Sequence, residues 1–320
     1  MEETVSYAAS WFVYLGVLVT AVAGTLSLCR AGAPEWLAVA TVTILAGALV
    51  LALQRAWAAR DEWRRYGRDI WVDLLHAIVS TGAVSALVRA AILGVAVSAS
   101  ALIARAAPAQ LWPDAWPMYA QLGLALLIGD LGAYWVHRIA HESEFFWRFH
   151  ALHHTAEHLY GINSARNHPL NVALSYLASV GPLIAVGASS EVLMASAVFT
   201  SVHGVLQHSN LDLRLGALEW VMAGPGVHRW HHSAELEESQ TNYGSNLIVW
   251  DVVFGTRFRP AGRQPVRIGL PDWSVPANFL AHLGTPFRFA AYEVDTVSQT
   301  PVGPESPPRA CTAEVHVAPG

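Results

Sequence analysis

The histidines of this chain are concentrated in one region, and their spacing is that of metal ligands. Twelve of the fifteen histidines fall between positions 137 and 232. Residues three or four apart share one face of an α-helix, so we expect the imidazoles of each closely spaced group to aim at one point. Three groups have this spacing, the first a pair and the others in threes: His137 and His141; His150, His153 and His154; His228, His231 and His232.

The number of these histidines indicates more than one metal ion. Neutral imidazole binds iron, zinc, copper and nickel, and eight imidazoles exceed what a four-coordinate zinc site can use. Two metal ions that share the eight and keep open positions are the simplest interpretation. His203 and His208, at the end of the last apolar segment, would bring the count to nine or ten. The His-Glu-x-x-His pattern of zinc proteases is not formed at His141 and Glu142.

The composition predicts a membrane protein as the support for these ligands. Charged residues are 13% of the chain, about half the usual share in soluble proteins, and 53% of the residues are hydrophobic. These values exclude an ordinary soluble globule and exclude disorder for most of the length. A net charge of −5 leaves no basic surface, so we expect no nucleic acid partner. Two cysteines can form no disulfide framework and no iron–sulfur site.

The apolar residues form segments that are long enough to cross a bilayer. The first has 23 residues without a charge, sufficient for a hydrocarbon core of about 30 Å. The predicted crossings are 7–29, 36–53, 74–104, 119–136, 170–187 and 191–206. Five arginines between 55 and 68 predict a cytoplasmic loop and a cytoplasmic N-terminus. By parity, residues 137–169 and 207–232 share that cytoplasmic face, while the loop 107–117 is external.

We therefore predict an all-α fold, a polytopic membrane helical bundle with a cytoplasmic histidine-rich helical cap. The expected location is the bacterial inner membrane. The last residues, 291–320, are rich in proline and poor in apolar side chains, and they are predicted to be a disordered tail.

The order of the motifs resembles the membrane fatty acid hydroxylase and sterol desaturase superfamily. The three histidine boxes have the pattern of that family, His-x-x-x-His followed by two copies of His-x-x-His-His. Further similar segments are 130–141 (DLGAYWVHRIAH), 166–169 (RNHP), 208–210 (HSN), 225–233 (PGVHRWHHS), 242–244 (NYG) and 250–256 (WDVVFGT). Asn171 stands where many relatives carry Glu. The resemblance is close from 130 to 256, while the first hundred residues are similar only in being predicted membrane spans. It implies a family-like domain over 118–290.

The resemblance also implies a cofactor and an activity. The family uses a non-haem centre of two iron ions that activates O2 and attacks an unactivated C–H bond of a lipid. The eight box histidines carry over as ligands. His203 and His208 correspond less closely, because their spacing is five where some relatives have four. For His168, which precedes Pro169, direct ligation and a helix cap remain alternatives.

Two further polar residues are candidates for the catalytic machinery. Asp130 lies seven residues before His137, two turns along the same helical face, and an acid inside a membrane span is expected to be functional. We expect it to orient a ligating imidazole, with pairing to His76 or Arg89 as the alternative. Asn242, with Tyr243, is placed either to hydrogen-bond the metal centre or to form a simple turn.

The predicted reaction needs an electron source that the chain does not supply. No glycine-rich dinucleotide loop follows a strand, so a separate reductase, ferredoxin or cytochrome is the expected electron donor. The product is a hydroxylated or a desaturated lipid, and we favour hydroxylation because it needs only one correctly aimed hydrogen abstraction. The alternatives to an oxygenase are a histidine-rich membrane haem or electron-transfer protein and a metal transporter.

Overall fold

Three long apolar helices in the first third of the chain have the dimensions of membrane spans. The computed structural model describes residues 6–64, 69–103 and 111–293. The first two spans are α1 (Tyr7–Arg30) and α2 (Glu35–Ala56); the third covers Asp69–Val95. These positions confirm the predicted crossings at 7–29 and 36–53 and the greater part of that at 74–104. The chain is an integral membrane protein.

The third span is one continuous helical rod with a wider turn in its middle. It runs through α3 (Asp69–Leu75), the π-helical segment η2 (His76–Ala83) and α4 (Val84–Ile103). The helices α5 (Met118–Glu142), α7 (Pro169–Ala185) and α8 (Ser190–Gln207) occupy the other three segments expected to cross. None of these three helices has both the length and the hydropathy that mark the first three as membrane spans, so their membrane crossing stays a prediction.

The remaining elements are short and helical. They are η1 (Asp61–Arg64), α6 (Glu144–His154), η3 (Ile162–Ala165), η4 (Gly216–Trp220), α9 (Pro225–His231), α10 (Leu236–Ser239), α11 (Val249–Phe254), α12 (Phe279–Gly284), η5 (Thr285–Phe287) and η6 (Phe289–Tyr292). Within the described residues the only β-structure is a set of isolated bridges, such as that between Met222 and Leu247. The all-α prediction is confirmed. The predicted tail from 294 onward and residues 107–110 of the predicted external loop lie outside the described residues.

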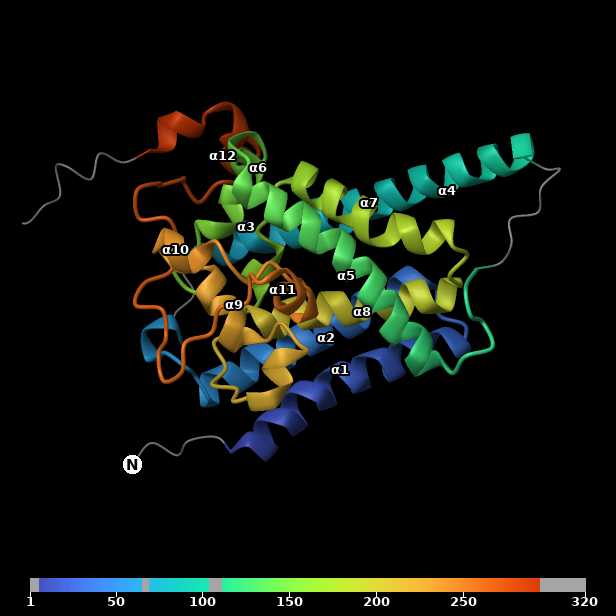
Figure 1. Cartoon of the computed structure of the whole chain (residues 1–320), viewed down its shortest axis with the longest axis horizontal. Helices are drawn as coiled ribbons and strands as arrows, with labels where there is room; N and C mark the ends of the chain where they lie inside the picture. The colour runs from blue at the N-terminus through green and yellow to red at the C-terminus, as the bar shows by residue number, and fades with distance from the viewer. Residues whose placement is uncertain (1–5, 65–68, 104–110, 294–320) are drawn as a thin grey trace, which may run out of the picture.

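The long helices lie side by side, and the short helices gather at one end of them, on the left in Figure 1. Helices α1, α2 and α8 pack against one another, and α5 packs against α7 and α8. The α5–α7 crossing is very close. A Cβ at Gly132 would lie 2.0 Å from the carbonyl oxygen of Ala178, and one at Gly129 would lie 3.2 Å from that of Ser179. Small residues permit such close helix contacts in membrane proteins.

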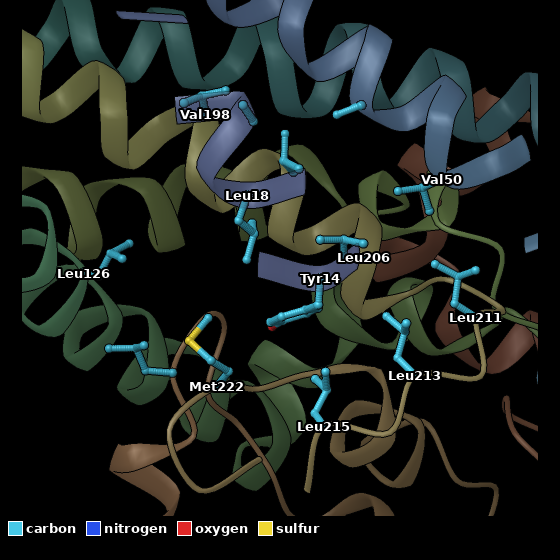
Figure 2. Packing of buried hydrophobic residues seen from close by; sticks show 14 residues of the cluster. Tyr14, Leu18, Val50, Leu126, Val198, Leu206, Leu211, Leu213, Leu215 and Met222 are labelled. Carbon is cyan, nitrogen blue, oxygen red and sulfur yellow. The ribbon is translucent and has the colours of Figure 1, made fainter. Parts of the chain in front are cut away.

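An apolar core joins the first two helices to α8 beneath the short helices. Figure 2 shows members of this cluster, among them Tyr14 and Leu18 of α1, Val50 of α2 and Leu206 of α8. The segment that follows α8 also contributes, through Leu211, Leu213, Leu215 and Met222. All these side chains are at least nine-tenths buried. The core therefore fixes the end of α8, which His208 directly follows.

Candidate metal centre

The first two histidine boxes meet because the chain reverses direction over one residue. Helix α5 ends at Glu142 and α6 begins at Glu144, with Ser143 between them in an extended conformation. The two helices therefore fold back on each other. The Nε2 atom of His137 lies 3.0 Å from that of His150, and the Nε2 atom of His141 lies 3.1 Å from that of His154.

The third box lies on a short buried helix. Helix α9 begins with Pro225 as its first residue, a position where the missing N–H costs no hydrogen bond. The preceding Gly224 allows close packing, because a Cβ there would lie 2.5 Å from a side-chain carbon of Leu215. All residues of α9 are buried, so the helix carries His228 and His231 into the interior of the cap.

Nine histidines form two compact groups in the described part of the chain. The ligand atoms in each group lie within 4.8 Å of one another. Group one contains His137, His141, His150, His154 and His231; group two contains His153, His208, His228 and His232. The structure thus brings together all eight box histidines and adds His208 from the end of α8.

The expectation that each box aims its imidazoles at one point was wrong for the second and third boxes. His153 and His154 are neighbours in sequence but belong to different groups, and His231 is separated from His228 and His232. Successive residues of an α-helix are rotated by about 100°, so adjacent side chains point in different directions. Each of these two helices therefore contributes to both groups.

Backbone carbonyls fix the orientation of four of the rings. The Nδ1 atoms of His137 and His231 each lie 2.7 Å from a carbonyl oxygen, of Tyr243 and Thr241 respectively. In group two, the Nδ1 atoms of His153 and His208 lie 3.2 Å and 3.0 Å from the carbonyl oxygens of Arg166 and Gly204. A carbonyl only accepts, so each Nδ1 must carry the proton and donate it. The Nε2 atom of each ring then has a free lone pair, as a metal ligand requires.

Two of these lone pairs face each other without a proton between them. The Nε2 atoms of His153 and His208 are 3.1 Å apart, and both rings donate their Nδ1 protons elsewhere. The Nε2 atom of His231 is buried and has no hydrogen-bond partner in the described part of the chain. Buried polar atoms are normally paired, and facing lone pairs repel. A cation held between the rings resolves both problems, so the residues present fit a bound metal.

The spacing of the nitrogens also bears on the coordination geometry. Two ligand nitrogens about 2.1 Å from one ion lie about 3.0 Å apart at a right angle and about 3.4 Å apart at a tetrahedral angle. The close Nε2 pairs in these groups, including those of His228 with His208 and His232, are separated by 3.0 to 3.2 Å. Nitrogens this close together could ligate one ion jointly.

Burial keeps the imidazoles neutral. Desolvation, followed by repulsion from neighbouring imidazoles, lowers the pKa of His154 and His232 well below its usual value. The neutral ring is the form that binds a metal. Aromatic rings cover group one, with the centroids of Trp147 and Tyr243 at 5.1 Å and 5.3 Å from that of His141.

His203 lies outside both groups. Its Nε2 atom is 2.6 Å from the hydroxyl oxygen of Tyr14, and both residues are fully buried. His168, the other histidine with an open assignment, caps α7. Its Nδ1 atom accepts the backbone N–H of Leu170 at 3.1 Å, which is the helix-cap alternative.

Asp130 does not contact a histidine, contrary to the prediction that it orients one. Its Oδ1 atom accepts the backbone and side-chain N–H groups of Asn246, both at 2.9 Å, and its Oδ2 atom accepts the backbone N–H of Leu247 at 2.7 Å. The pairing alternative with His76 or Arg89 is not formed either. Asp130 instead anchors a loop of the cap to α5.

Asn242 has a left-handed backbone conformation, and its side chain bonds to backbone groups of neighbouring segments. It is the only non-glycine residue in the described part of the chain with a positive φ, 56°. Its side chain donates to the carbonyl oxygens of Val227 and Phe258 and accepts the backbone N–H of Phe258. Within the described residues Asn242 forms no hydrogen bond to the histidine groups, and residues 242–244 are irregular chain and not a turn.

Asp251 is a residue of the site that was not among the candidates predicted from sequence. Its two carboxylate oxygens accept the backbone N–H groups of Tyr243 and Gly244 at 2.7 Å and 2.8 Å. Asp251 and Asp130 thus hold the two ends of the loop 243–247, whose first carbonyl orients His137. Asp251 lies in one of the family-like segments, which was the available signal. The carbonyl partners of the histidines have no signature in sequence.

The two histidine groups lie within a region of the chain that matches a known family. A family model described as fatty acid hydroxylase matches residues 122–256. Ornithine lipid hydroxylase OlsE of Rhizobium tropici is 36% identical over 243 residues, which are 75% of this chain and 72% of that protein. The chain belongs to the fatty acid hydroxylase family.

More distant members of the fatty acid hydroxylase family are monooxygenases. Alkylglycerol monooxygenase of Danio rerio is 31% identical over 193 residues, 58% of this chain and 41% of the relative. Methylsterol monooxygenase erg25A of Aspergillus fumigatus is 25% identical over 161 residues, 49% of this chain and 53% of the relative. The chain thus spans less than two thirds of either monooxygenase. No solved structure matches the chain.

Membership of the fatty acid hydroxylase family confirms the class of activity expected from the histidine boxes. The protein is a membrane oxidoreductase of the lipid hydroxylase type. A haem or electron-transfer protein and a metal transporter, the two alternatives, are not favoured.

Proposed function

We propose that this chain is a di-iron monooxygenase that inserts one atom of O2 into a C–H bond of a polar membrane lipid. The observation that carries the proposal is the convergence of nine imidazoles, eight of them buried and that of His137 partly buried, into two adjacent groups. Desaturation is disfavoured, because the relatives are named hydroxylases and monooxygenases. In the proposed location, the bacterial inner membrane, the N-terminus and the histidine cap face the cytoplasm.

The proposed ligands are the nine grouped histidines, five for one iron ion and four for the other. His203 is left out of the proposed set because its Nε2 atom is engaged by Tyr14. A bound pair of iron ions supplies the two-electron activation of O2 that an unactivated C–H bond requires. In the balanced reaction, one oxygen atom enters the C–H bond and the other leaves as water, with two electrons and two protons consumed.

The chain's own residues orient the ligands. The carbonyl oxygens of Tyr243 and Thr241 hold the rings of His137 and His231 in the ligating orientation. Asp130 and Asp251 fix the loop that carries the first of these carbonyls. Asp130 and Asn242 are therefore proposed as positioning residues and not as groups that touch the substrate.

The proposed partners are a lipid and a separate electron donor. By their names, the relative from Rhizobium tropici acts on ornithine lipid and the relative from Danio rerio acts on alkylglycerol. We therefore propose an amphiphile with a polar headgroup as substrate. The two electrons come from a reductase, ferredoxin or cytochrome. For the domain organisation, we propose N-terminal transmembrane helices (1–117), a hydroxylase domain (118–290) and a tail (291–320).

The decisive experiment combines metal analysis with isotope labelling. The purified iron-loaded protein is mixed with a bacterial polar lipid extract, a chemical or ferredoxin-based reductant and dioxygen labelled with heavy oxygen. We expect two irons per chain without haem absorbance, and a lipid that gains one labelled oxygen. A product that loses two hydrogens without label would establish a desaturase instead. Haem absorbance at one haem per chain would refute the proposal.

A further inference from the structure

A polar cavity of about 210 Å³ lies beside the metal centre, at the end of the third span. Its wall includes Asp69, the first residue of that span, and Thr155, which directly follows the metal-ligand candidate His154. The cavity is smaller than the roughly 300–1,000 Å³ typical of a pocket for a whole small molecule. Its size suits a lipid headgroup better than an entire lipid.

A buried arginine in the cavity wall has N–H donors without a good hydrogen-bond acceptor. The side chain of Arg166 is 3% exposed, and its Nε and Nη2 atoms donate to Asp73 and Asp69 at 2.6 to 3.0 Å. Its Nη1 atom carries two more N–H groups. Their single contact in the described part of the chain is the hydroxyl of Thr155 at 3.5 Å, which is too long for a good hydrogen bond. The two N–H groups of the Nη1 atom can therefore donate to an oxygen atom of a ligand.

The charges around the cavity also require a positive group on that ligand. Asp69, Asp73 and Glu157 carry three negative charges against the single positive charge of Arg166, a net charge of −2. Glu157 is exposed and forms no ion pair within the described residues. The wall histidines His158 and His282 add little charge, because burial lowers the pKa of both, that of His282 to about 3. A purely anionic headgroup would be repelled.

We infer that this cavity binds a zwitterionic lipid headgroup that carries a primary ammonium group. The anionic oxygen of the headgroup accepts the Nη1 donors of Arg166, and the ammonium group pairs with Glu157. An acylated amino acid and a phosphoethanolamine share this chemistry. This inference rests on the proposed function, since it names the headgroup class of the lipid substrate.

The surroundings of the cavity are those expected at the membrane surface, where lipid headgroups lie. Leu280 of α12 and Phe287 of η5 are 75% and 81% exposed beside the cavity residue His282. Exposed apolar side chains next to a polar cavity are expected where a surface meets lipid. Arg166 also links the cavity to the metal centre, because its carbonyl oxygen accepts the Nδ1 proton of His153.

The test is a calorimetric titration of the metal-loaded full chain in a non-ionic detergent with three single-chain probes. These are an N-acyl ornithine, a lysophosphatidylethanolamine and a lysophosphatidylglycerol. We expect both zwitterionic probes to bind at least about tenfold more tightly than the anionic one, because like charges oppose the latter. The tighter of the two zwitterions identifies the source of the headgroup. Equal binding of all three probes would overturn the inference.

Two variants locate the binding site. Glu157→Gln should weaken the zwitterionic probes about tenfold, the effect of one lost charge pair. The control Glu237→Gln, at an exposed glutamate of α10, should bind all probes like the wild type. Wild-type binding by Glu157→Gln would refute the assignment. Arg166→Lys, checked for folding by circular dichroism, should weaken both zwitterions.

The outcomes separate this inference from the proposed function. Charge-dependent binding without any hydroxylated product would leave the headgroup site standing and remove the proposed reaction. A labelled hydroxylated lipid, combined with probe binding that is unchanged in Glu157→Gln, would leave the proposed reaction standing and remove the headgroup site.

Discussion

The Nε2 atoms of His153 and His208 face each other at 3.1 Å, although the two residues are 55 positions apart in the chain. Both rings donate their Nδ1 protons to backbone carbonyls, of Arg166 and Gly204. Neither ring can therefore donate to the other while both are neutral. This relationship identifies His208 as a member of the second metal group and separates it from the nearby His203.

His208→Ala should remove one metal ion and leave the other. Group two then has three histidines, whereas group one keeps all five. We expect metal analysis of the purified variant to fall from two irons per chain towards one, with activity lost because both ions are needed. Retention of two irons would contradict the assignment.

His203→Ala provides the matched comparison on the same helix. It removes the hydrogen bond to Tyr14 and leaves a buried hydroxyl without its partner, which costs about 1–3 kcal/mol. The variant should therefore melt at a lower temperature and still contain two irons. Loss of one iron from this variant would restore His203 as a ligand.

Gly132→Ala should disrupt the crossing of α5 and α7. The added Cβ would lie 2.0 Å from the carbonyl oxygen of Ala178, so the helices must separate. Overpacking of this kind costs about 1–3 kcal/mol or more, and thermal unfolding in detergent measures it. Gly123→Ala, on the same helix with no atom within 4 Å of the new Cβ, should be neutral or stabilising. Equal melting temperatures for the two variants would show that the close contact is not formed.

Asp130→Ala should loosen the loop that orients the first histidine box. Three buried N–H groups, of Asn246 and Leu247, lose their acceptor. Each unsatisfied group costs about 1–3 kcal/mol, so a drop in unfolding free energy of about 3 kcal/mol or more is expected. Iron content should fall as well, since the same loop carries the carbonyl partner of His137. The exposed Asp272→Ala is the control, and an unchanged iron content in Asp130→Ala would argue against the positioning role.

Metal removal should lower stability without unfolding the long helices. The apolar core around Tyr14 contains none of the nine grouped histidines, so circular dichroism should show nearly unchanged helix content after chelation. The melting temperature should fall on metal removal. Each ion present at a free concentration of about one hundred times its Kd stabilises the folded state by about 2.7 kcal/mol. Metal-free protein that melts like the loaded form would show that the groups do not bind metal in the folded state.

The spacing of apolar residues and histidines was sufficient to predict much of this protein. Uncharged runs such as 7–29 have a strong hydropathy signal and predicted the membrane spans directly. The three histidine boxes predicted a metal centre, because spacings of three and four place side chains on related faces of a helix. The family followed from the same residues and was confirmed by comparison.

Tertiary structure alone decided which histidines form a group and which residues hold them in place. His153 and His154 are adjacent in sequence, yet the rotation of about 100° per residue sends them to different groups. The partners of Asp130 lie 116 and 117 positions away on a loop, and those of His137 and His153 are backbone carbonyls. Every residue has a backbone carbonyl, so no sequence pattern marks the ones that will accept these protons. Only the packing of the cap against α5 and α8 selects them.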